Sequence, residues 1–186
     1  LFRSFADPND PADMEAAHAL QDRIQVRPAE AGKFEVPDWD PTSLRKVRDA
    51  LNVLAATRTD LTGLFGEKSK LNPIDHLLGA AAGWGGNPKE AAVYQIRTPQ
   101  LNDGTTPYVV TVRDVPVDGF WSITVYNAKG YMEPNPRNLY SVNGVTARRN
   151  PDGSVTVHFG GDPGSVNYLP INAGWSYVAR MYQPRK

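Results

Sequence analysis

The sequence predicts a mainly β protein, in which a helical amino-terminal segment precedes an antiparallel β-sandwich. Apolar residues recur at helical spacing within residues 1–90, whereas apolar and polar residues alternate from Ala91 onward. The second half also contains several short strand-like runs, separated by turns rich in glycine, proline and asparagine. We therefore expect residues 1–90 to form a helical segment that packs on the sandwich, and residues 91–186 to form the sandwich itself.

Three helix starts occur in the amino-terminal half. Asp10–Asp13 supplies a capping aspartate, a proline at the first helical position and an acidic first turn, which predicts a helix over Met14–Gln21. A second start at Asp40–Ser43 leads into apolar residues on one helical face, and a third at Asn72–Asp75 leads into a helix that Gly83 ends. The apolar face of the second helix comprises Leu44, Val47, Leu51, Leu54 and Ala55.

The alternating pattern first predicts a β-hairpin. Val93–Thr98 alternates in polarity, and Asn102–Gly104 is a tight turn of the kind that joins hairpin strands. Tyr108–Arg113 is therefore expected to return beside the first strand. Asp118–Gly119 then turns the chain into Phe120–Asn127, which is the cleanest strand pattern in the sequence.

A second hairpin is predicted around the turn Asn150–Gly153, whose asparagine, proline and glycine each suit their positions. Val145–Arg149 and Ser154–Phe159 flank this turn as its two strands, and Leu139–Val142 and Trp175–Tyr182 complete the set. The core should contain residues on the more apolar face of each strand, namely Trp121, Val125, Val157 and Trp175.

Charge and residue content exclude several classes of protein. Lys plus Arg and Asp plus Glu number 20 each, so no net charge attracts nucleic acid or an acidic membrane surface. Cysteine is absent, which excludes disulfides, thiolate metal sites and a cysteine nucleophile. No apolar run approaches the roughly 18 residues that span a bilayer. Because Leu1 is not an initiator methionine and begins no signal sequence, we expect the chain to be a piece of a longer precursor.

Neither a metal nor a cofactor is expected from the sequence. The three histidines, His18, His76 and His158, lie on different predicted elements and share no metal-ligand spacing. The glycine run Gly83–Gly86 follows a helix rather than a strand, and it lacks the lysine and hydroxyl residue of a phosphate-binding loop. We therefore interpret this run as a helix stop and a tight turn, in which Trp84 is a buried anchor.

Six segments carry a family resemblance: Gly83–Pro88, Asp118–Ser122, Val125–Ala128, Tyr131–Asn135, Asn150–Ser154 and Gly174–Arg185. They resemble the DUF1214 family, a bacterial family of unknown function whose members usually follow a DUF1254 domain in the same chain. The resemblance covers most of residues 72–185. It implies a jelly-roll-like β-sandwich, a missing amino-terminal partner domain and an export signal on the full-length protein, hence a periplasmic or otherwise exported location. It implies no established reaction.

The loop after the strand Phe120–Asn127 carries the candidate ligand site. Alternation leaves Tyr126 off the core face, near a loop that presents Tyr131, Glu133 and Asn135. Aromatic rings combined with amide and carboxylate groups suit a sugar or another small polar ligand. The same residue types also suit a contact with the missing domain, because protein interfaces are rich in Tyr, Trp and Met. The sequence leaves these two interpretations open.

Two residues are candidates for a catalytic acid or base. Glu133 has no structural role that the sequence reveals, and His158 faces away from the apolar side of its strand. A triad of Ser122, His158 and Asp162 can be written, but no nucleophile-elbow motif accompanies it. Asp162 is explained as well by the turn in which it lies.

Three functions are consistent with these observations. The first is a domain that binds a small polar or sugar-like ligand together with the missing amino-terminal domain. The second is a hydrolase whose acid or base is Glu133 or His158, and the third is a structural or oligomerisation module. Whether the protein is an enzyme, and whether its copies assemble, stays open. A cavity that contains Tyr131 and Glu133 would favour the first two functions, and a flat apolar patch would favour the third.

Overall fold

The structure of the protein is a computed structural model that describes residues 6–7, 10–25, 32–33, 35–58, 63–83 and 85–185. The chain divides into two compact units, Leu1–Pro41 and Thr42–Lys186. In the first unit, α1 (Pro11–Asp22) begins where the Asp10 side chain accepts the backbone N–H groups of Ala12 and Asp13. The predicted first helix is therefore confirmed, as is its capping residue.

Two further helices precede the strands in the sequence of the second unit. They are α2 (Pro41–Ala56) and α3 (Pro73–Gly83), and a short 3₁₀ turn at Lys68–Lys70 lies between them. The Asn72 Oδ1 atom accepts the N–H groups of Ile74 and Asp75 at 2.9 and 3.4 Å, which fixes the start of α3. Both helices were predicted from the sequence. None of the helices in the described ranges is long and apolar enough to span a membrane.

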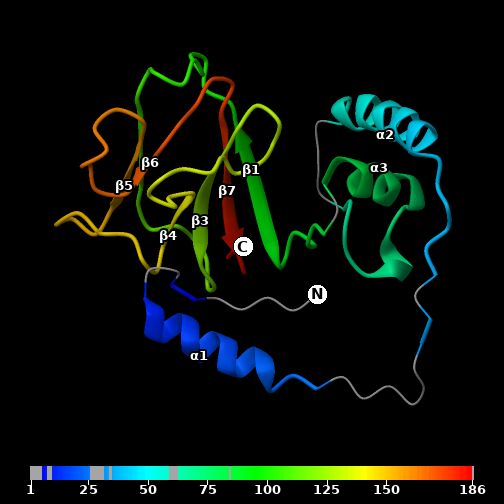
Figure 1. Ribbon diagram of the computed structural model, residues 1–186, viewed down its shortest axis with the longest axis horizontal. Coiled ribbons are helices and arrows are strands. Elements are labelled where there is room, and N and C mark those ends of the chain that lie inside the picture. The colour runs from blue at the N-terminus through cyan, green and yellow to red at the C-terminus, as the bar shows by residue number, and fades with distance from the viewer. Residues whose placement is uncertain are drawn as a thin grey trace. The chain divides into compact units, whose positions relative to one another are not determined.

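Four strands form the larger of two sheets, in the order β1-β7-β3-β4, and each neighbouring pair is antiparallel (Figure 1). These strands are β1 (Ala92–Arg97), β3 (Trp121–Tyr126), β4 (Ser141–Asn143) and β7 (Ser176–Tyr182). The chain's last strand therefore lies at the centre of this sheet. Its partners come from parts of the sequence at least fifty residues earlier.

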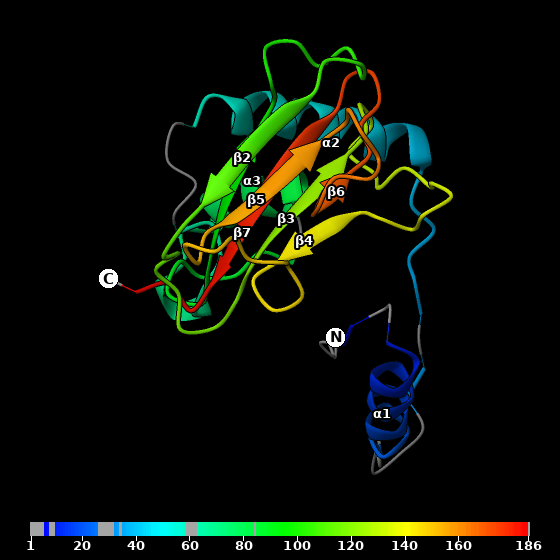
Figure 2. The same cartoon turned by 90° about the vertical axis from the view of Figure 1, so that its left-hand side faces the viewer.

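Three strands form the second sheet, in the order β2-β5-β6. They are β2 (Tyr108–Val112), β5 (Val155–Phe159) and β6 (Tyr168–Leu169). β2 pairs antiparallel with β5, whereas the short pairing of β5 with β6 is parallel. Figure 2 shows β2 and β5 in front of β7 and β3, so that the two sheets lie as two layers. The jelly-roll order of strands stays a prediction, and so does the domain boundary at residue 90.

The core lies between the two sheets and is built from the alternate residues that the sequence pattern indicated. Trp121, Ile123 and Val125 of the larger sheet are buried, and they pack in one cluster with Val155, Val157 and Phe159 of the smaller sheet. Trp175 belongs to the same cluster and is the largest fully buried side chain in the described residues. The prediction that Trp121, Val125, Val157 and Trp175 form the core is confirmed.

The predicted hairpin between the first two strands is wrong, because β1 and β2 belong to different sheets. β1 pairs with β7, and β2 pairs with β5. The turn at Asn102–Gly104 does form, since the Asp103 carboxylate accepts the N–H groups of Thr105 and Thr106. However, this turn carries the chain from one sheet to the other. Turn chemistry is local, whereas strand partners are chosen by long-range packing.

The predicted strand Val145–Arg149 is also wrong. The Asn143 Oδ1 atom accepts the N–H groups of Val145 and Thr146, each at 2.9 Å, and curls the chain into a turn directly after β4. The Asn167 side chain then accepts a hydrogen bond from the N–H of Arg148 and donates one to the C=O of the same residue. It thereby takes the place of the backbone of a neighbouring strand. The turn Asn150–Gly153 is confirmed, but it joins this irregular segment to β5. β6, with only two residues, was not predicted.

The carboxylate of Asp103 makes the stability of the turn dependent on pH. Hydrogen bonds from the Thr106 and Thr105 backbone N–H groups, and from the Thr106 hydroxyl, hold the pKa of Asp103 well below its usual value. A lowered pKa stabilises the fold above the unfolded-state pKa of about 3.9, and this contribution is lost as the pH falls through the lower folded-state value.

We therefore expect Asp103→Asn to lower the free energy of unfolding at neutral pH, because asparagine keeps an acceptor but loses the charge. The difference from the wild type should shrink as the pH falls below about 4. Urea unfolding of both proteins, from neutral pH to below about pH 4, measures this difference in the free energy of unfolding. A difference that stays constant with pH would show that the charge of Asp103 contributes nothing.

Candidate functional site

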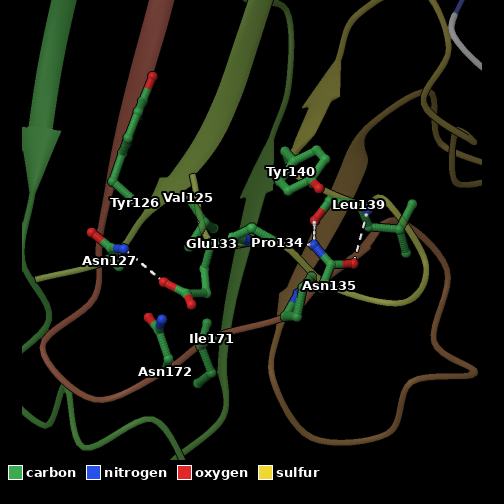
Figure 3. A pocket seen from close by; sticks show the side chains of 11 residues that line it. Val125, Tyr126, Asn127, Glu133, Pro134, Asn135, Leu139, Tyr140, Ile171 and Asn172 are labelled. Carbon is green, nitrogen blue, oxygen red and sulfur yellow. Dashed lines mark hydrogen bonds between the residues drawn. The ribbon is translucent and has the colours of Figure 1, made fainter. Parts of the chain in front are cut away.

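A small cavity opens where β3 ends, and three segments of the chain line it (Figure 3). Its volume is about 210 Å³. The end of β3, the loop that follows it and the segment just before β7 supply the walls. The lining residues are Val125, Tyr126, Asn127, Glu133, Pro134, Asn135, Leu139, Tyr140, Pro170, Ile171 and Asn172.

Three polar side chains gather at one end of this cavity. The Asn127 Nδ2 atom donates a hydrogen bond to the Glu133 Oε2 atom at 2.6 Å, and the Asn172 side chain points toward both (Figure 3). The second carboxylate oxygen of Glu133 and the Asn172 side-chain amide have no hydrogen-bond partner among the residues that the structure describes. The Glu133 carboxylate, positioned by Asn127, and the unpaired Asn172 amide are therefore both available to a ligand in the cavity.

The loop between Asn127 and Tyr140 is held by asparagine side chains. The Asn127 Oδ1 atom accepts the N–H groups of Lys129 and Tyr131 at 2.9 and 3.0 Å. The Asn135 side chain accepts the N–H of Leu139 at 3.1 Å and donates to the C=O of the same residue at 3.0 Å. Because these bonds lie within the loop, both asparagines position the loop backbone, and through it Glu133.

The structure separates the four residues that the sequence grouped as a ligand site. Glu133 and Asn135 line the cavity, although the Asn135 side chain is used within the loop. Tyr126 also lines it, but its ring points away from Glu133 (Figure 3), and its hydroxyl accepts a hydrogen bond from Arg180 at 2.5 Å. Tyr131 is absent from the lining, and its side chain is 68% exposed.

Two polar residues of the site were missed by sequence reasoning. Asn127 ends the strand that the sequence predicted, so its place beside the loop could have been inferred from the strand boundary. Asn172 lies 45 residues further along the chain, and no local signal connects it to Glu133. The sequence revealed no structural role for Glu133, and the structure shows a partner for it, since the turn after β3 brings its carboxylate to Asn127.

The candidate catalytic triad does not assemble. Ser122 lies opposite Arg180 in the larger sheet, on the face that points away from the core, because its neighbours Trp121 and Ile123 point into the core. His158 lies on the outer face of the smaller sheet, since Val157 and Phe159 are buried. Ser122 and His158 therefore lie on opposite outer faces of the two layers.

His158 and Asp162 have structural partners instead. The His158 Nδ1 atom lies 2.8 Å from the C=O of Val166, which ties β5 to the loop that leads into β6. The Asp162 Oδ1 atom accepts the N–H of Gly164 at 2.8 Å, as expected of an aspartate in a turn. His76 likewise lies 2.9 Å from the C=O of Leu64 through its Nδ1 atom.

The described parts of the chain contain no group of three or more His, Asp or Glu side chains that could hold a metal ion. In the glycine run at the end of α3, Gly85 lies in a turn and has a φ of +78°. Gly86 packs so closely on the Phe65 ring that a Cβ atom there would lie 2.3 Å from it. Trp84, predicted to be a buried anchor, lies outside the described residues.

The solved structures that are similar to this chain include two crystal structures. The crystal structure of the VPA0106 protein from Vibrio parahaemolyticus matches 100% of this chain and 54% of its own, with a TM-score of 0.60 and 23% identity. The chain thus spans about half the length of that protein, and the likeness concerns the fold. A crystal structure of an uncharacterised protein from Burkholderia cenocepacia matches 60% of this chain and 31% of its own, with a TM-score of 0.43 and 25% identity.

The comparison with curated proteins finds no match. The family model described as "Protein of unknown function (DUF1214)" matches residues 94–186, which contain every strand of both sheets except the first two residues of β1. This match covers half of the chain and includes all the residues that line the cavity. The resemblance inferred from the sequence motifs is confirmed, and the chain belongs to the DUF1214 family.

Proposed function

We propose that this domain binds a small polyhydroxylated ligand, such as one sugar ring, in the cavity between Glu133 and Asn172. The observation that carries the proposal is the Glu133 carboxylate, which Asn127 holds at 2.6 Å with the Asn172 amide beside it. A fixed carboxylate offers only acceptors, and a carboxamide offers both donors and an acceptor. Adjacent hydroxyl groups of one ligand can therefore bond both side chains at once.

The other walls of the cavity suit the apolar parts of such a ligand. Leu139, Pro134 and Ile171 line it, together with Tyr140. A pocket with mostly apolar walls and a few placed polar groups is typical of small-molecule sites. The volume of about 210 Å³ is below the roughly 300–1,000 Å³ of pockets for drug-sized ligands. The cavity is therefore suited to a single ring.

We expect Glu133→Gln to weaken the affinity for the ligand about tenfold or more, because a hydrogen bond to a charged group contributes about 1.5–3 kcal/mol. Asn172→Ala removes a neutral partner and should weaken it by about two- to tenfold. Saturation-transfer NMR with a panel of monosaccharides and polyols would identify a binder. Calorimetric titration of that binder would then measure the affinity of each variant.

Tyr131→Ala is the matched control, because Tyr131 belongs to the same loop but does not line the cavity. The affinity of the Tyr131→Ala variant for the monosaccharide or polyol found by NMR should equal that of the wild type. The proposal fails if no sugar or polyol of the panel binds, or if Glu133→Gln binds as tightly as the wild type.

A second candidate function is a contact with another domain of the same precursor. Tyr131 and Met132 are 68% and 52% exposed, and they are adjacent in the loop but outside the cavity lining. Exposed tyrosine and methionine side chains are common at protein interfaces. The hydrolase hypothesis has less support, because Glu133 is the one carboxylate among the lining residues and these include no histidine. It stays a prediction, as does an oligomerisation role.

A further inference from the structure

The outer face of the larger sheet carries a single cationic residue among its four strands, Arg180 of the central strand β7. Tyr177, Ala179 and Met181 of the same strand pack against the core, so Arg180 points to the other side. In the sheet register, Tyr94 and Ser122 lie directly opposite Arg180 on its two sides. Residues that lie opposite each other in antiparallel strands share one face, so these three side chains form one row.

Tyr126 holds the Arg180 guanidinium in place. The Arg180 Nη2 atom donates to the Tyr126 hydroxyl at 2.5 Å, and the guanidinium carbon lies 5.6 Å from the centre of the tyrosine ring. Tyr126 is four residues from Ser122 along β3, about 13–14 Å at the rise of a strand. Because Arg180 lies opposite Ser122, the side chains of Arg180 and Tyr126 must extend toward each other along the sheet to form this bond. They meet over Thr124, which explains why Thr124 is only 7% exposed.

Some N–H donors of the guanidinium are not used in hydrogen bonds with the described residues. Arg180 makes no ion pair with a carboxylate of the described residues, and its Nε and Nη1 atoms have no partner among them. Its neighbours on β1 are apolar and accessible, since Ile96 is 62% exposed and Tyr94 is 37% exposed. A held guanidinium with unused N–H groups matches the planar geometry of a carboxylate.

We propose that this face binds a small apolar carboxylate, with its carboxylate group on Arg180 and its apolar body over Ile96 and Tyr94. One cation favours a singly charged group over a phosphate dianion, which would need further positive charge. The apolar body would cover exposed side chains of β1 and add hydrophobic stabilisation. Tyr126 belongs to both sites, but its ring points away from Glu133, and the present proposal does not depend on the function proposed for the cavity.

The experiment is an NMR titration of the 186-residue chain with 4-methylbenzoate and with its neutral analogue 4-methylbenzamide. We expect the benzoate to bind more tightly than the benzamide, and to shift the Arg180 Nε–H and Ile96 methyl resonances. Arg180→Gln should weaken benzoate binding about tenfold or more, because the lost bonds are charge-assisted. It should change benzamide binding by less than about twofold.

Arg97→Gln is the matched control. Arg97 lies on the same sheet opposite Tyr177, hence on the other face, and its Nη1 atom bonds the C=O of Ile96. This variant should bind the benzoate as the wild type does. Ile96→Ser tests the apolar contact at a position too exposed to unfold the protein, and it should weaken benzoate binding severalfold.

Three results would overturn the proposal. The first is a wild-type protein that binds benzoate and benzamide equally, or binds neither up to the solubility limit of the probe. The second is an Arg180→Gln variant that folds and keeps full benzoate affinity. The third is an Ile96→Ser variant with unchanged affinity, which decides against the site even if Arg180→Gln does not fold.

Discussion

Replacing Trp175 with alanine is expected to lower the free energy of unfolding by about 3–5 kcal/mol. Trp175 is 0% exposed and is the largest fully buried side chain of the described residues. Its ring stacks with Phe159 at a centroid distance of 5.1 Å and meets the Tyr108 ring edge-on at 5.9 Å. Truncation therefore leaves a cavity between the two sheets that neighbouring side chains can fill only in part. Chemical denaturation of the two proteins measures the difference.

Trp175→Phe should lower the free energy of unfolding by less than half as much as Trp175→Ala. The indole Nε1 atom is buried and has no hydrogen-bond partner among the described residues. An unpaired buried donor costs about 1–3 kcal/mol, and phenylalanine removes it while keeping an aromatic ring. Tyr131→Ala is the exposed control and should change stability by no more than about 0.5 kcal/mol. If Trp175→Ala unfolds at the wild-type denaturant concentration, the core is assigned wrongly.

Gly104→Ala is expected to destabilise the protein by about 2–5 kcal/mol, because two costs add. The residue has a φ of +83°, which an alanine adopts only with strain. A Cβ atom at this position would also lie 2.4 Å from the backbone nitrogen of Ala173 and 2.5 Å from the carbonyl carbon of Asn172. The clash is with backbone, so the segment that carries Asn172 must move, and ligand binding at the Glu133 cavity should weaken as well.

Gly153→Ala separates the two costs. Gly153 has nearly the same φ, +80°, but nothing lies within 4 Å of the Cβ atom that would be added. This variant should therefore lose only the conformational part, about 1–2 kcal/mol, and should bind ligand normally. Urea unfolding of both variants gives the comparison. Equal losses at the two positions would show that the close approach of Gly104 to the Asn172 segment does not exist in solution.

The larger sheet shows most clearly where sequence reasoning succeeded and where it failed. The alternation in Phe120–Asn127 correctly predicted β3 and its buried face. The turn Asn102–Gly104 was also predicted correctly, yet the hairpin built on it does not exist. The side-chain bonds of Asp103 close a turn whatever follows it, and they do not determine in which sheet the next strand lies.

The Glu133 cavity likewise combines a feature that the sequence predicted with features that it did not predict. The sequence indicated the loop after β3 as the functional surface, and this loop does line the cavity. Its chemistry, however, depends on Asn127 and Asn172, which the fold brings to Glu133 from the end of β3 and from the segment before β7. The orientation of Tyr126 was likewise decided by a partner on another strand, Arg180.

The sequence by itself determined the features that depend on neighbours within a few residues. These are the helix starts at Asp10 and Asn72, the turn at Asn150–Gly153, the buried faces of the strands and the family. Only the tertiary structure decided the strand order, the parallel pairing of β5 with β6, and the residues that meet at each candidate site. The reason is physical: caps, turns and alternation are local energies, whereas sheet partners are selected by packing between segments that lie far apart in the chain.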